Sequence, residues 1–92
     1  MKTRTIKELL ILLRDFLPTN IHNEVREGGC ICYSITDMVS DDIITGEECG
    51  ILSGFIERHK PKGIKIHNVG YWWKYRMLAP RMRFLNKLIS EL

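Results

Sequence analysis

A four-residue pattern, Thr-x-x-Glu, occurs twice in this chain, each time directly before apolar residues at helical spacing. The first copy joins Thr5 to Glu8, and the second joins Thr45 to Glu48. In such a capping box the threonine hydroxyl accepts a hydrogen bond from the amide three residues on, while the glutamate reaches back to the threonine amide. The two copies therefore predict that helices begin at about residues 5 and 45.

Prolines and apolar stripes set the other helix boundaries. Pro18 and Pro61 end the helices before them, and Pro80 suits the first position of the last helix. Ile11 and Leu12 lie off the main stripe of the first helix, so that helix is either central or in contact with a second chain. The expected helices span about residues 5–17, 30–41, 45–59 and 80–92.

These elements predict a mainly α fold. We expect one compact four-helix domain over residues 1–92, with an irregular segment or a short β-hairpin at about 62–78. The longest apolar run, Leu9–Leu13, is far shorter than the ~20 residues that span a bilayer. The three cysteines are an odd number, which favours a reducing compartment over a disulfide framework. The prediction is a cytoplasmic protein with no membrane partner.

Two local features conflict with helix formation. Asp41 and Asp42 lie near the end of the second helix, where the helix dipole disfavours negative charge. Gly50 and Gly54 lower helix propensity in the third helix, together with Ser53. Small residues at this spacing let another helix approach closely, and we expect that here.

Charge is unevenly divided along the chain. Residues 1–53 carry nine acidic and five basic side chains, a net charge of −4, whereas residues 54–92 carry nine basic and two acidic ones, a net charge of +7. Such asymmetry indicates an electrostatic partner, or attraction between the two halves within one chain or between two chains.

Basic and aromatic side chains are interleaved in residues 58–83. Lysine and arginine neutralise phosphates, and tyrosine and tryptophan stack on bases, so this segment predicts a surface for a nucleotide or nucleic acid. Two arginines near the start of the last helix would face the positive end of its dipole, and a bound anion would offset that cost. The predicted ligand-binding residues are Lys62, Lys65, Tyr71, Trp72, Trp73, Lys74, Tyr75, Arg76, Arg81 and Arg83.

Other interpretations of this segment stay open. One of the adjacent tryptophans could be buried as a plug at the open end of the bundle. Tryptophan, tyrosine and arginine are also enriched at hot spots of protein interfaces, which would make the same patch a protein-binding site. The broad apolar surface of the first helix leaves homo-oligomerisation as a third interpretation.

The residue patterns favour neither catalysis nor a metal. Cys30 and Cys32 form a lone C-x-C, which is a weak zinc motif, and small buried cysteines explain it more simply. The acidic residues around Asp41 do not match a calcium loop. No spacing pairs a cysteine nucleophile with His59 or His67. We therefore expect a non-enzymatic protein without a cofactor.

Several short motifs resemble, in order and spacing, those of small and mostly uncharacterised bacteriophage proteins. They are Gly29-Cys30-Ile31-Cys32, Ile44-Thr45-Gly46-Glu47-Glu48, Pro61, Trp72-Trp73 and Pro80-Arg81 with Phe84-Leu85. The resemblance covers about residues 28–89 and implies a helical fold and a viral origin. By analogy with other small phage proteins, it also implies an inhibitor of host defence that acts by binding.

The combined prediction is a non-enzymatic, phage-type protein of the host cytoplasm that modulates or inhibits a host defence system. Its partner would be a nucleotide signal or nucleic acid, bound through residues 58–83. The alternative is an inhibitor or adaptor, comparable to anti-CRISPR proteins, that engages a host effector protein through the same patch.

Overall fold

The computed structural model describes residues 3–19, 31–60 and 78–92, and this part of the chain is mainly α-helical. Its helices are α1 (Ile6–Phe16), a short 3₁₀ helix η1 (Leu17–Thr19), α2 (Ile31–Ser40), α3 (Gly46–His59) and α4 (Leu78–Ser90). The mainly α fold is thereby confirmed. The hairpin predicted at about 62–78 lies almost entirely outside the described residues.

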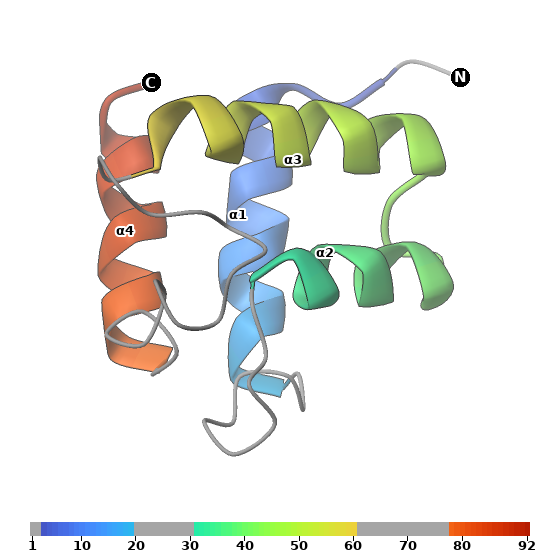
Figure 1. Ribbon diagram of the computed structural model, residues 1–92, viewed down its shortest axis with the longest axis horizontal. Coiled ribbons are helices and arrows are strands. Elements are labelled where there is room, and N and C mark those ends of the chain that lie inside the picture. The colour runs from blue at the N-terminus through green and yellow to red at the C-terminus, as the bar shows by residue number, and fades with distance from the viewer. Residues whose placement is uncertain (1–2, 20–30, 61–77) are drawn as a thin grey trace.

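Helix α1 lies at the centre of the bundle, in contact with α2, α3 and α4. Figure 1 shows α4 running antiparallel beside α1, while α2 and α3 form a helical hairpin that crosses α1. A hydrogen bond of 3.3 Å from Arg14 Nη1 to Asn86 Oδ1 joins α1 to α4 at the surface. The apolar character of α1 on more than one face is explained by this central position.

The core gathers the apolar stripes of all four helices. Each of α1, α2, α3 and α4 contributes buried side chains to it, and Ile44 in the α2–α3 turn belongs to it as well. Its buried members are Leu9, Leu10, Leu13, Leu17, Ile31, Ile35, Met38, Ile44, Leu52, Ile56, Phe84, Leu85 and Leu88. None of the helices in the described ranges is both long and apolar enough to cross a bilayer.

Both predicted capping boxes are present. Thr5 caps α1 and Thr45 caps α3, each accepting a hydrogen bond from the amide of the glutamate three residues on. Each glutamate in turn accepts a hydrogen bond of 2.9 Å from the amide of its threonine. The helix starts predicted from the two Thr-x-x-Glu patterns are confirmed.

Helix α2 ends in a Schellman motif, which turns the chain towards α3. The amide of Asp42 donates to Val39 O at 3.0 Å, and the amide of Ile43 donates to Met38 O at 2.8 Å. Asp42 occupies the left-handed position of this motif, with φ of 59°. Glycine is the usual residue there, because a Cβ atom in this conformation crowds the following carbonyl.

Two sequence predictions about helices need correction. Helix α4 begins at Leu78, so Pro80 is its third residue instead of its first. Proline is tolerated there because the amides of a first helical turn have no acceptor within the helix. The close approach expected at the α3 glycines is also absent from the described structure: a Cβ on Gly50 would meet nothing within 4 Å, and one on Gly54 would meet only Arg58 Nη1, at 3.2 Å.

Candidate functional site

Most of the predicted ligand surface falls outside the described residues. Lys62, Lys65, Tyr71, Trp72, Trp73, Lys74, Tyr75 and Arg76 all lie there, and they remain predictions. The structure describes only the two ends of the segment, which are the last turn of α3 and the first turns of α4.

The two described arginines of the predicted surface have different environments. Arg81 is 1% exposed, whereas Arg83 is exposed. Because α4 begins at Leu78, Arg83 lies in its second turn, beyond the first turn to which the dipole effect is largely confined. The expectation that both arginines face the positive helix end is therefore corrected. Arg83 is the described member of the surface that solvent reaches.

The other end of the segment lies in the last turn of α3. The ring of His59 stacks on Phe55, with centroids 4.1 Å apart, and His59 Nδ1 lies 2.8 Å from Phe55 O. Lys60 Nζ pairs with Glu57 Oε1 at 2.8 Å. Arg58 is exposed. In Figure 1 this end of α3 lies towards the C-terminal end of α4. Arg83 lies near the middle of α4, which spans Leu78–Ser90.

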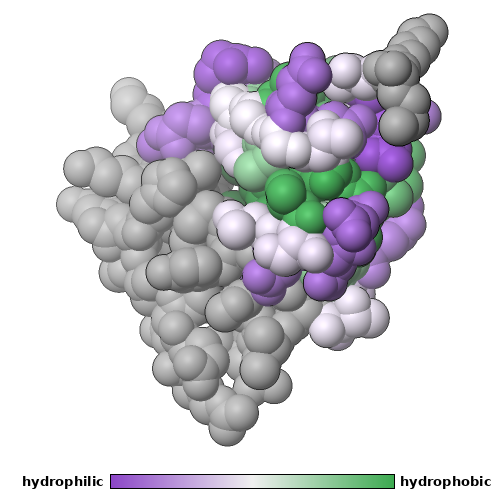
Figure 2. Space-filling view, turned by 90° about the vertical axis from the view of Figure 1, so that its right-hand side faces the viewer, coloured by the Kyte–Doolittle hydropathy of each residue, from purple (hydrophilic) through white to green (hydrophobic). Residues whose placement is uncertain are grey.

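A pocket of about 630 Å³ opens at the α2–α3 turn, on the opposite side of the molecule from α4 (Figure 1). Its apolar part comes from the end of α2 and the turn, namely Val39, Ile43 and Ile44. Figure 2, which views this side of the molecule, shows apolar side chains exposed between polar ones. The remaining lining residues are Thr3, Arg4, Asp42, Thr45, Gly46, Glu47 and Glu48.

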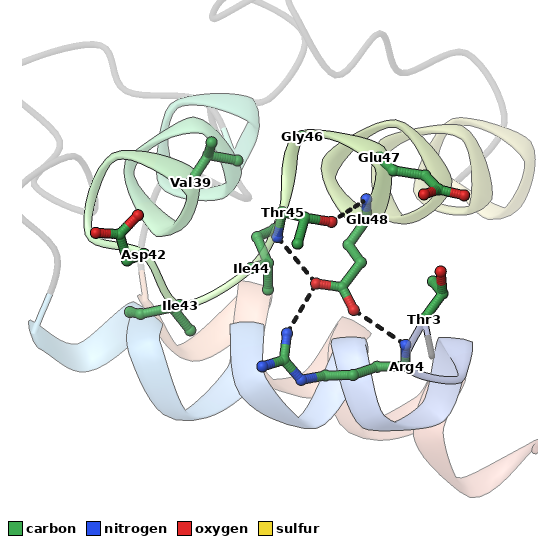
Figure 3. A pocket seen from close by; sticks show the side chains of 10 residues that line it. All are labelled: Thr3, Arg4, Val39, Asp42, Ile43, Ile44, Thr45, Gly46, Glu47 and Glu48. Carbon is green, nitrogen blue, oxygen red and sulfur yellow. Dashed lines mark hydrogen bonds and ion pairs between the residues drawn. The ribbon is translucent and has the colours of Figure 1, made fainter. Parts of the chain in front are cut away.

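Glu48 joins the starts of α1 and α3 at one wall of this pocket (Figure 3). It is 3% exposed. Its Oε1 accepts hydrogen bonds from Arg4 Nη1 at 2.8 Å and from the Thr45 amide at 2.9 Å, while its Oε2 accepts one from the Arg4 amide at 3.0 Å. Glu48, the glutamate of the α3 capping box, thus also holds Arg4, which directly precedes the α1 N-cap Thr5.

These donors lower the pKa of the Glu48 carboxyl. The hydrogen bond from the Arg4 amide is the largest cause, and the one from the Thr45 amide comes next. Burial opposes them, because it disfavours the charged form, and the charge of the Arg4 guanidinium assists them. Glu48 is therefore an ionised structural anchor, and its role between two helices was missed because a capping box is a local signal.

Two further carboxylates stand at the mouth of the pocket. Asp42 and Glu47 are both exposed. Neither makes an ion pair with any residue of the described segments. Figure 3 shows Ile43 and Ile44 between Asp42 on one side and Glu48 on the other. The pocket therefore has an apolar floor and an acidic mouth.

Metal binding finds no support in the described segments. No group of three or more histidine, cysteine, aspartate and glutamate side chains among residues 3–19, 31–60 and 78–92 could hold an ion. Cys49 is a half-buried free thiol on α3. Cys30 of the C-x-C motif lies outside the described residues, so the weak zinc motif remains untested.

Comparisons with known proteins find no match to this chain. No family model matches it, and neither a curated protein nor a solved structure is significantly similar to it. The functional argument therefore depends on the chain's own residues.

Proposed function

We propose that this chain is a non-enzymatic binding protein of the bacteriophage type that inhibits or modulates a host defence system in the host cytoplasm. Its ligand is an anion, either a nucleotide signal or a nucleic acid, and the binding surface is the basic–aromatic segment 58–83. The proposal joins the resemblance in motifs to the charge of the C-terminal half.

One observation on α4 supports an anionic ligand. Arg83, which belongs to the predicted surface, is exposed on α4 and makes no ion pair within the described part of the chain. A bound phosphate would give this guanidinium the ionic partner that the described residues do not supply.

The tryptophans supply a direct test. Both tryptophans of the chain lie within the predicted surface, so their fluorescence reports on that surface alone. We expect quenching on titration with ATP or with a single-stranded oligouridylate, because stacking changes the environment of an indole. For the oligonucleotide, log affinity should fall with log salt by about 0.7 for each phosphate neutralised.

The discriminating variant is Arg83→Glu, and Lys7→Glu is its matched control. Both residues are exposed on helices, and both substitutions change the net charge by the same amount. Arg83→Glu should reduce the affinity roughly tenfold and make the salt slope shallower by about 0.7, whereas Lys7→Glu should leave both nearly unchanged. Equal losses in the two variants would mean that net charge alone drives binding, and the proposed surface would then be wrong.

Failure to bind either probe at low salt would contradict the anionic ligand. The alternative would then be an inhibitor that engages a host effector protein through the aromatic and arginine residues of the same segment. Trp73→Ala and Arg76→Ala test that alternative: both should abolish inhibition of the effector in a folded protein.

A further inference from the structure

The acidic-mouthed pocket at the α2–α3 turn is not used by the proposed function. Its carboxylates Asp42 and Glu47 have no cationic partner in residues 3–19, 31–60 or 78–92. Among the described residues that line it, the one cation, Arg4, is turned towards Glu48 (Figure 3). A ligand for this pocket would therefore have to be cationic and have apolar atoms for the floor of Val39 and Ile43.

Long basic side chains have this combination. Lysine and arginine lay their aliphatic stems along apolar surface while the charged head stays at the polar edge. In this pocket the stems would cover Val39 and Ile43, and the heads would reach Asp42 and Glu47. Charge-assisted hydrogen bonds to carboxylates are the stronger class of hydrogen bond.

A matching basic face is present on the same protein, at its other side. Arg83 and Lys87 are exposed on α4 and have no acidic partner among the described residues. Figure 1 places α4 and the α2–α3 turn on opposite sides of the molecule, with α1 between them. The two described surfaces therefore cannot meet within one chain, although two chains can bring them together.

We infer that copies of this protein associate head to tail, with the basic face of α4 (Arg83 and Lys87) seated on the pocket at the α2–α3 turn of the next copy. The occupant is a second copy because the chain itself supplies both complementary charges, net −4 in residues 1–53 and net +7 in residues 54–92. The contact joins two different surfaces, so it leaves one pocket and one basic face free at the ends and can add further copies.

The pocket walls are preorganised for such a contact. Glu48 holds the segment before α1 against the start of α3, and the Schellman motif fixes the turn that carries Asp42. A surface that is ordered before association loses little conformational freedom on binding. Steering between opposite charges should make the association sensitive to salt.

Sedimentation velocity over a range of protein concentrations tests this inference. In 50 mM NaCl we expect the weight-average mass to rise with concentration above the 10.8 kDa of one chain. In 500 mM NaCl it should return towards that value, because salt screens exposed charges. A single 10.8 kDa species at every concentration in low salt, or an assembly indifferent to salt, would overturn the inference.

Two charge reversals identify the surfaces. Glu47→Lys alters the pocket and Lys87→Glu alters α4, and each alone should weaken self-association roughly tenfold, because it replaces an attraction by a repulsion. An equimolar mixture of the two variants should associate again, since the reversed α4 face then meets the reversed pocket. Circular dichroism checks that both variants fold, and Lys7→Glu is the matched control that should associate like the parent chain.

The equimolar mixture of the two variants is the decisive test of the head-to-tail contact. Restored association supports the head-to-tail contact, and its failure overturns it even if each single variant is a monomer. Glu47 and Lys87 lie outside the proposed ligand surface at 58–83, so oligouridylate binding should persist in both variants. The two proposals can therefore fail independently.

Discussion

Replacing Asp42 by glycine should stabilise the protein, because aspartate occupies the left-handed position of the Schellman motif with φ of 59°. An L-residue in this conformation costs roughly 1–2 kcal/mol, towards the lower figure for aspartate. Glycine avoids that cost but loses more backbone freedom on folding, which returns roughly 0.5 kcal/mol. The backbone gain is therefore about 0.5–1 kcal/mol.

The charge of Asp42 adds a second contribution. Asp42 lies two residues beyond Ser40, the last residue of α2, where the dipole is negative, and removing an exposed negative charge there should contribute about 0.3 kcal/mol. The sum for Asp42→Gly is then about 1 kcal/mol, equivalent to a rise of roughly 4–8 °C in Tm for a domain of this size.

Two further substitutions at the same position separate these contributions. Asp42→Asn removes the charge and keeps a side chain that tolerates the left-handed conformation, so it should stabilise by only about 0.3 kcal/mol. Asp42→Ala also removes the charge but loses that tolerance, and it should be less stable than Asp42→Gly by about 1 kcal/mol. Urea unfolding followed by circular dichroism at 222 nm measures all three, in dilute samples at low ionic strength, so that the dipole contribution is not screened and self-association is limited by the low protein concentration. Equal stability of the alanine and glycine variants would refute the left-handed assignment.

Three other substitutions test the fold. Leu13→Ala should destabilise by about 2–5 kcal/mol because Leu13 is fully buried in the central helix, whereas Ile51→Ala, at a position 37% exposed, should cost far less in the same urea assay. Gly50→Ala should stabilise by about 0.5–1 kcal/mol, since its Cβ would meet nothing within 4 Å, and a loss of stability would show that another surface covers this face of α3. Glu48, whose pKa is lowered in the folded state, contributes stability that is present above its ordinary pKa of 4.5 and is lost as the pH falls through the folded value. Glu48→Gln should therefore flatten the fall in Tm below pH 5, measured by circular dichroism at a series of pH values.

The helical architecture could be predicted because its signals are local. Each capping box specifies a helix start within four residues, and the structure places Thr5 and Thr45 at the two N-caps. The apolar stripes then determine which face of each helix is buried. The start of α4 was less well predicted, since Pro80 is compatible with any position of a first turn and the sequence contains no capping box there.

The junction at Glu48 could not be predicted, because it depends on two segments far apart in the sequence. Arg4 and Glu48 are separated by 44 residues, and only packing of α3 across α1 brings them together. The open surroundings of Gly50 were also unpredictable. Small residues on a helix allow another helix to approach closely, but they do not show whether a helix is there. Arg81 and Arg83 looked equivalent in sequence, but the structure buries the first and exposes the second.

The two proposals meet at Arg83. An anion that contacts Arg83 and a neighbouring copy whose pocket covers it cannot occupy the same guanidinium, so the two forms of binding must oppose each other. Linkage requires the opposition to be mutual: a ligand that favours the free chain dissociates the assembly, and assembly lowers the affinity for the ligand by the same factor. Lys87 belongs to the self-contact but lies outside the ligand surface, so its substitution alters assembly without directly altering the ligand site. The reversal Lys87→Glu should release chains from the assembly and thereby raise the apparent affinity for the anion. If net charge alone determined binding, the added negative charge would lower that affinity instead.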